Sequence, residues 1–143
     1  MSNERAGSAV WSGALKDGAG KISTQSGAMD GVQYGFNTRF EDGPGTNPEE
    51  LIGAAHAGCF TMALSGILAE AGMTAKHLAT TATVTLDKVD GAFAITKVHL
   101  NLVATIPGAN QEAFEAAVLR AKNNCPVSKL LNATITLDAT LQS

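Results

Sequence analysis

The feature that most restricts the fold of this chain is a run without any charged residue, from position 51 to position 69. A helix over this run would be apolar or weakly polar on every face, and such a helix belongs in a core rather than on a surface. The run is also long enough to raise the question of a membrane span. Because its many Gly, Ala, Ser and Thr residues make it only mildly hydrophobic, we expect the buried helix of a soluble protein.

Local signals place both ends of this helix. Asn47 is a good N-cap, Pro48 suits the first helical position, and Glu50 stands where a capping-box acid reaches back to the cap. We expect the helix to run to about Ala71, with Gly72 as a left-handed residue after its end. Glycines inside it lower helix stability by roughly 1 kcal/mol each against alanine, which suggests close approach of another backbone. They are Gly53, Gly58 and Gly66.

Size and charge bound the class of protein. With 143 residues, the chain is expected to form a single domain, residues 1–143, around one core. Charged residues make up only 16% of it, which points to surface hidden in an oligomer. The net charge of -3 gives no electrostatic case for a nucleic-acid or membrane partner. The polar N-terminus has no apolar signal core, so we expect a cytoplasmic protein. In that reducing compartment we do not expect the two cysteines to form a permanent structural disulfide.

Alternating apolar and polar residues predict strands on both sides of the long helix. Three precede it, at residues 9–15, 20–25 and 32–40, and three follow it, at 81–86, 95–102 and 133–141. In the third strand, Arg39 would point to the opposite face from Phe40. Asp90-Gly91 is a strong hairpin signal between the fourth and fifth strands.

A second helix is predicted over residues 111–123, after a good N-cap at Asn110. Its apolar face would carry Phe114, Ala117, Val118 and Ala121. Cys125-Pro126 breaks it, because the residue before proline avoids helical geometry, and a short helix could follow over 126–131. The order of three strands, helix, two strands, helix and strand indicates an α+β domain.

The two cysteines are the first candidates for chemistry. Cys59 lies among small and apolar residues, where a free cysteine is usually an inert hydrophobe with a raised pKa. Cys125 could cap the short helix that begins at Pro126, whose amide groups and dipole would lower its pKa, or it could be a simple chain-reversal residue. Two cysteines in a chain with no others suggest a pair, but contact needs Cα atoms within roughly 7 Å.

Arg39, Glu49 and His56 are the other candidates. Arg39 could hold a thiolate or an anionic reaction centre, or be an ordinary surface arginine at a strand end. Glu49 could simply stabilise the helix dipole in the first turn. His56 lies one turn before Cys59, which allows a Cys–His nucleophile or, with Cys125, a zinc site, although a satisfied core histidine is the simpler interpretation. There is no phosphate-binding glycine loop, dinucleotide signature or serine elbow, so no cofactor is indicated.

Three segments, taken together, closely resemble the OsmC/Ohr family of thiol-dependent peroxidases, in its osmotically inducible OsmC branch rather than its Ohr branch. They are Thr46-Asn47-Pro48-Glu49-Glu50-Leu51, Ala54-Ala55-His56-Ala57-Gly58-Cys59-Phe60 and Cys125-Pro126-Val127-Ser128. The resemblance covers nearly the whole chain. It implies an OsmC-like fold, with antiparallel-rich sheets and a long central buried helix, and an intertwined homodimer of an antioxidant, stress-response enzyme.

The resemblance also implies roles for individual residues. Cys59 matches the peroxidatic cysteine of the family, and Cys125 matches the resolving one. Glu49 matches the glutamate that pairs with an arginine, for which Arg39 is the best candidate. The implied substrates are small organic hydroperoxides, with hydrogen peroxide as a second candidate. The implied cycle passes through a Cys59 sulfenic acid and a redox-active Cys59–Cys125 disulfide, which a dithiol reductant of the lipoyl-linked kind reopens.

Helix geometry adds a constraint on how these residues share a site. In an unbroken helix, Glu49 and Cys59 would lie roughly 15 Å apart along the axis and face about 80° apart. We therefore expect each site to combine Cys59 and Cys125 of one subunit with Glu49 and Arg39 of the other.

Two rival functions and a substrate pocket remain as hypotheses at this stage. One rival is a Cys–His hydrolase or acyltransferase that uses Cys59 and His56. The other is a non-catalytic module that stores a small hydrophobic ligand. An apolar pocket that favours organic over inorganic peroxides could be built from residues near the site. Its candidates are Phe60, Met62, Phe36 and Tyr34.

Overall fold

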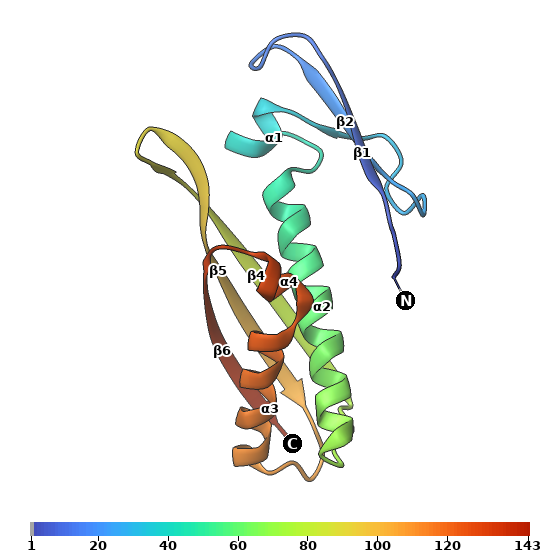
Figure 1. Cartoon of the computed structure of the whole chain (residues 1–143), viewed down its shortest axis with the longest axis vertical. Coiled ribbons are helices and arrows are strands. Elements are labelled where there is room, and N and C mark those ends of the chain that lie inside the picture. The colour runs from blue at the N-terminus through green and yellow to red at the C-terminus, as the bar shows by residue number, and fades with distance from the viewer. Residues whose placement is uncertain (1) are drawn as a thin grey trace. The chain divides into compact units, whose positions relative to one another are not determined.

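A computed structural model describes residues 2–143, which divide into two compact units at Leu51/Ile52 (Figure 1). The first unit holds β1 (Gly7–Ser12), β2 (Ala19–Thr24), β3 (Val32–Tyr34), α1 (Phe36–Phe40) and the start of α2 (Pro48–Glu70). The second holds the rest of α2, β4 (His77–Val89), β5 (Ala92–Thr105), α3 (Gln111–Asn124), α4 (Pro126–Leu130) and β6 (Thr134–Gln142). The predicted α+β order is confirmed, with α1 as an unpredicted addition.

The first unit is an antiparallel sheet in the order β1-β2-β3. Trp11 on β1 and Tyr34 on β3 meet edge to face across it, with ring centroids 5.6 Å apart. Gly20 lies on β2 between them, where a Cβ atom would come within 2.4 Å of the Tyr34 ring and 2.6 Å of the Trp11 ring. The glycine is therefore needed for the two rings to lie over the middle strand.

The predicted third strand over 32–40 is wrong in its second half. The strand ends at Tyr34, and residues 36–40 form the short helix α1 instead. The Thr38 hydroxyl accepts a hydrogen bond from the Gly35 amide at 2.8 Å, and the Arg39 amide donates to the Gly35 carbonyl at 3.2 Å. Such local bonds give the backbone an alternative to strand pairing, which the alternation of side chains did not reveal. Arg39 therefore lies on a helix turn and not at a strand end.

The predicted start of α2 is confirmed at Asn47. Its side-chain oxygen accepts from the Glu50 amide at 2.7 Å, and its side-chain amide donates to the Thr38 carbonyl at 2.9 Å. Asn47 thus caps α2 and ties α1 to it. The capping-box expectation for Glu50 is not met, because its carboxylate accepts instead from the Thr46 hydroxyl at 3.0 Å.

The second unit contains a sheet in the order β4-β5-β6, antiparallel between β4 and β5 and parallel between β5 and β6. The predicted hairpin is confirmed: Asp90 and Gly91 have φ values of 51° and 81°, as a tight two-residue turn requires. The central strand β5 turns alternate residues inward. Val98, Leu100, Leu102 and Ala104 are all fully buried.

Helices α2 and α3 run side by side against this sheet (Figure 1) and close the core of the second unit. The predicted inner face of α3 is confirmed by the burial of Phe114, Ala117, Val118 and Ala121. From α2 the core takes Phe60, Leu64 and Leu68, each fully buried. Gly72 ends α2 with the predicted left-handed φ, at 77°.

Within one chain, α2 is buried along one face only. Met62 on the opposite face is 78% exposed, and no described atom lies within 4 Å of a Cβ built at Gly58 or Gly66. The length and apolar composition of α2 would also suit a membrane span, but its buried positions pack in the core of a globular unit. The expectation that α2 is buried on every face is therefore confirmed only for its inner face.

The glycines of α2 give a matched test of the packing. At Gly53 a Cβ would meet the Ala82 carbonyl oxygen at 2.9 Å, so Gly53→Ala should lower the free energy of unfolding by about 1–3 kcal/mol. No described atom of its own chain lies near a Cβ built at Gly66, so Gly66→Ala should be better tolerated than Gly53→Ala. Urea denaturation measures both. Tolerance of Gly53→Ala would contradict the close approach of α2 to β4.

Candidate active site

The structure brings the two cysteines together. Cys59 projects from the middle of α2, beside Phe60 in the core, and is partly exposed. Cys125 is fully buried against the same core. The two thiols lie close enough for each to shift the pKa of the other, and neither is in a disulfide. The hypothesis that these two distant cysteines form a pair is confirmed.

Backbone geometry explains how Cys125 reaches Cys59. Its amide donates to the Ala121 carbonyl at 3.0 Å and closes α3, while its carbonyl accepts from the Lys129 amide at 3.1 Å and opens α4. Pro126 is the first residue of α4, a position that suits proline, and it keeps the two helices separate. Because the inner face of α3 is anchored in the core, the sulfur at the break is held against α2.

The pKa values of the two thiols are shifted in opposite directions within this chain. Burial raises the pKa of Cys59, and hydrogen bonding to Cys125 raises it further. Burial would also raise the pKa of Cys125, but hydrogen bonds from Cys59, from the Ser128 amide and hydroxyl and from the Val127 amide outweigh burial and lower it. The first thiolate of the pair therefore forms on Cys125, as its place before Pro126 predicted.

His56 does not form a dyad with Cys59. Its imidazole Nε2 lies 2.7 Å from the Ser128 hydroxyl oxygen, and both side chains are buried. Burial lowers the pKa of His56, so the ring is neutral near pH 7. The Cys–His nucleophile suggested by the sequence is wrong for this pair of residues. Across residues 2–143, no cluster of three or more His, Cys, Asp or Glu residues could hold a metal ion.

Arg39 and Glu49 form an ion pair in the first unit. The Arg39 Nε lies 2.7 Å from Glu49 Oε1, with side-chain exposures of 38% for Arg39 and 11% for Glu49. The predicted pairing of these two residues is present. The Arg39 terminal nitrogens have no hydrogen-bond partner within residues 2–143, and neither does the buried second oxygen of Glu49. The guanidinium is thus fixed through one nitrogen and presents the others.

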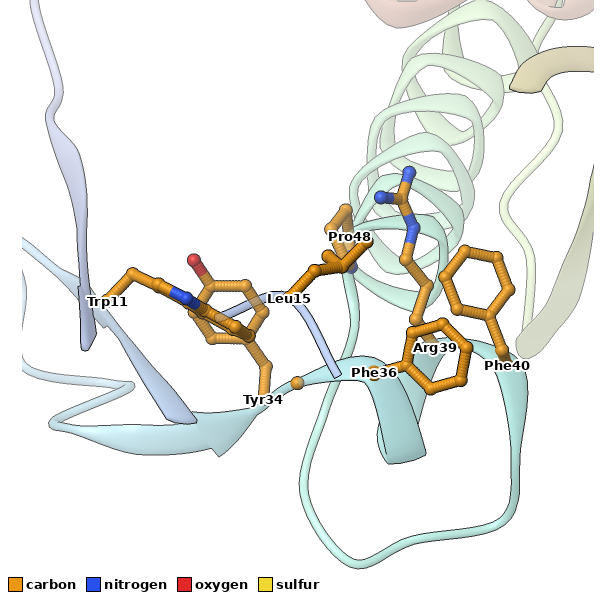
Figure 2. A pocket seen from close by; sticks show the side chains of 8 residues that line it. Trp11, Leu15, Tyr34, Phe36, Arg39, Phe40 and Pro48 are labelled. Atoms are coloured by element: carbon orange, nitrogen blue, oxygen red, sulfur yellow. The ribbon is translucent and has the colours of Figure 1, made fainter. Parts of the chain in front are cut away.

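An apolar cavity of about 330 Å³ surrounds Arg39 (Figure 2). Its lining consists of Trp11, Leu15, Tyr34, Gly35, Phe36, Arg39, Phe40 and Pro48. The Arg39 guanidinium also lies over the Phe40 ring, 5.6 Å from its centroid. Among these lining residues, one cation therefore faces a space otherwise walled by aromatic and aliphatic groups.

The predicted pocket residues divide between two places. Tyr34 and Phe36 line the cavity as expected. Phe60 is wrong as a pocket residue, because it is fully buried in the core, and Met62 is 78% exposed outside this cavity. Trp11 and Phe40 also line the cavity, although the sequence did not indicate them, and it assigned no role to Ser128. Its position three residues after Cys125, in the predicted short helix, could have indicated that Ser128 lies near this thiol.

Comparisons with known proteins point to a single family. Residues 41–140 match the family described as OsmC-like protein. Peroxiredoxin OsmC of Escherichia coli is 53% identical over 143 residues, the full length of both chains. Organic hydroperoxide resistance protein OhrB of Bacillus subtilis is 30% identical over 112 residues, 78% of this chain and 80% of that protein. The crystal structure of OhrB superposes with a TM-score of 0.71 at 26% identity, covering 94% of this chain and 98% of that one.

The buried neutral His56 makes the site acid-sensitive. Below about pH 6.5 the unfolded chain binds a proton at His56 that the folded chain resists, so the free energy of unfolding falls as the pH falls. We expect His56→Gln to remove a loss of up to about 2 kcal/mol between pH 7 and pH 5. Urea denaturation across this range measures the slope. His77→Gln, at an exposed position, is the control, and an unchanged slope in His56→Gln would contradict the assignment.

Proposed function

This chain belongs to the OsmC-like protein family, and we propose that it reduces organic hydroperoxides to alcohols, with Cys59 as attacking thiolate and Cys125 as resolving thiol. Full-length similarity to Peroxiredoxin OsmC makes it a peroxidase of this family. The observation that supports the residue assignment is the closeness of the two thiols in one chain, where each shifts the pKa of the other. Two sulfurs already in contact can form a disulfide without unfolding the core.

The proposed cycle follows from sulfur chemistry. The Cys59 thiolate attacks one peroxide oxygen, the O–O bond breaks, and the alkoxide takes a proton and leaves as the alcohol. Cys59 becomes a sulfenic acid. Cys125 then displaces its hydroxyl group as water and forms the disulfide before Cys59 is oxidised further. A dithiol reopens the bridge by exchange and is itself oxidised to a disulfide.

This cycle needs a cation at Cys59. Within one chain the thiolate is favoured on Cys125, whereas the attack on peroxide requires it on Cys59. A guanidinium beside Cys59 would reverse that order and polarise the peroxide. In this proposal Arg39 supplies the guanidinium, and Glu49 holds it in place through the 2.7 Å ion pair.

We place Arg39 and Glu49 in the site of the other subunit of a homodimer. Helix α2 is continuous from Pro48 to Glu70, so Glu49 and Cys59 are separated by roughly 15 Å along its axis and face about 80° apart. One helix cannot bring both to one reaction centre. The exposed face of α2 around Met62 supports such an assembly, since it leaves apolar surface for a second chain to cover. One functional domain, residues 1–143, then contributes to two sites.

The cavity around Arg39 supports an organic substrate. Its aromatic and aliphatic walls would bind the alkyl group of a hydroperoxide, while the guanidinium nitrogens would bind the peroxide oxygens. Organic hydroperoxide resistance is the named property of the related OhrB of Bacillus subtilis. Hydrogen peroxide, which has no alkyl group, would gain nothing from these walls and is the weaker substrate in this proposal.

The reductant is proposed to be a small or lipoyl-linked dithiol in the cytoplasm. Cys125 is fully buried and Cys59 is partly exposed, so exchange would begin at the Cys59 sulfur of the disulfide. A reducing compartment is needed to keep such a dithiol available.

Mass spectrometry after one equivalent of cumene hydroperoxide tests the thiol roles. We expect one Cys59–Cys125 link within a single chain. With Cys125→Ser, Cys59 should carry one or more added oxygens, and turnover with dithiothreitol should stop after one round. Sustained peroxide turnover of Cys125→Ser would contradict the resolving role of Cys125, since it would mean that dithiothreitol reduces the Cys59 sulfenic acid directly. Peroxide consumption that survives Cys59→Ser would contradict Cys59 as the attacking thiol.

Mixed dimers test the shared site. Arg39→Met and Cys59→Ser should each lower activity by about a hundredfold or more, because each removes one part of every site. A heterodimer of the two variants would hold one site with Cys59 from one chain and Arg39 from the other. We expect about half of the parent activity from purified heterodimer. A heterodimer as inactive as either variant would contradict the shared site and place all four residues in one chain.

A further inference from the structure

We propose that His56 is a positioning residue for the resolving thiol, acting through Ser128, whose hydroxyl proton it directs onto the Cys125 sulfur. The proposal rests on the proposed function in one respect, that Cys125 resolves the oxidised Cys59. It assigns a role to two residues that the peroxidase cycle described above does not use.

The first observation is burial. His56 has no exposed surface and Ser128 is 8% exposed, although both carry polar groups that usually stay in contact with water. The two side chains come from helices α2 and α4, far apart in the sequence, and meet at 2.7 Å. Burying a polar group costs free energy unless it is hydrogen-bonded, so this pair is held in the core by its own bond.

The second observation is the direction of the hydrogen bonds. Burial keeps the His56 ring neutral, so only one of its nitrogens carries a proton. The Ser128 hydroxyl acts on Cys125 as a hydrogen-bond donor, and its oxygen must then accept from His56 Nε2. The other nitrogen, Nδ1, is buried without a partner, which suits a bare lone pair better than an N–H group. The geometry therefore points to an Nε2–H···Oγ–H···Sγ chain.

This chain of donors ends on the atom that performs the second step of the cycle. In that step the Cys125 thiolate attacks the Cys59 sulfenic acid, the S–S bond forms and the S–O bond breaks. The leaving hydroxide takes up the proton that Cys125 released and becomes water. The Ser128 hydroxyl, held in place by the His56 Nε2–H, stabilises the thiolate that makes the attack, and both residues keep their own protons throughout.

Few other groups act on Cys125. The Cys59 thiol faces it from α2, the amides of Val127 and Ser128 face it from α4, and Lys129 on α4 is exposed. His56 is the one titratable side chain besides Cys59 that reaches it, through Ser128, within the described residues. Changes at His56 and Ser128 should therefore appear directly in the acidity of Cys125.

The test is a thiolate titration in the Cys59→Ser background, where Cys125 is the sole thiol. Absorbance at 240 nm against pH gives its pKa. Ser128→Ala should raise that pKa by about one unit, since a hydrogen bond to a charged group is lost. His56→Leu should raise it by less, and His56→Gln should restore it, because the Gln amide can donate in place of Nε2–H. Thr61→Val removes a hydroxyl that bonds Thr80 instead, and it should change nothing.

Kinetics separate this assignment from the proposed function. In chains with both cysteines, one unit of pKa means about tenfold less thiolate, partly offset by higher nucleophilicity, so disulfide formation should slow about threefold in Ser128→Ala. The first oxidation of Cys59 should not slow, because a less acidic Cys125 leaves more of the thiolate on Cys59. Thermal unfolding of each variant shows that it is folded before the titration is interpreted.

The outcomes are distinguishable. A Cys125 pKa that is unchanged in both Ser128→Ala and His56→Leu would overturn the assignment, whatever the peroxidase activity. Equal shifts in His56→Leu and His56→Gln would also overturn it, since they would mean a packing effect rather than a donated bond. The predicted shifts in a protein that consumes no peroxide would support the donor chain and contradict the proposed function instead.

Discussion

The contact between the Cys59 and Cys125 thiols is the interaction on which the rest of this molecule's chemistry depends. It exists because α3 ends where Pro126 forces a new helix to begin, and because the inner face of α3 is anchored against α2 and β5. A buried thiol next to another thiol is chemically different from an isolated one. Each sulfur shifts the pKa of the other, upward at Cys59 and downward at Cys125, and in the proposed cycle the two join once Cys59 is oxidised.

The site residues divide into two pairs that lie in different units of the chain. The thiols belong to the second unit, whereas the Arg39–Glu49 ion pair and the apolar cavity belong to the first. Helix α2 carries one member of each pair, Glu49 in its first turn and Cys59 in its middle. The two residues are ten positions apart on this helix. The proposed sharing of the site follows from that separation.

Much of the fold could be predicted because its signals are local. The cap at Asn47 with Pro48, the left-handed Gly72 and the Asp90-Gly91 turn each act over a few residues, and the structure has all of them. The failure at residues 35–40 had a local cause as well, since Thr38 bonds the Gly35 backbone and turns an alternating segment into a helix. Alternation alone could not distinguish the two outcomes.

The site was harder to predict because it depends on contacts between distant segments. The low pKa of Cys125 could be inferred from its place before a helix, but its contact with Cys59 and the bond between His56 and Ser128 required the packed structure. Family resemblance suggested the roles that we propose for Cys59, Arg39 and Glu49, which local physics left open.

Thiol counting during a peroxide titration tests whether Cys59 and Cys125 react as a pair. Aliquots of cumene hydroperoxide are added to the reduced protein, each sample is unfolded, and its free thiols are measured with a chromogenic disulfide. We expect both thiols of a chain to disappear together, two for each equivalent of peroxide consumed, and to return after treatment with dithiothreitol. A loss of one thiol per equivalent, or a loss that dithiothreitol does not reverse, would contradict it.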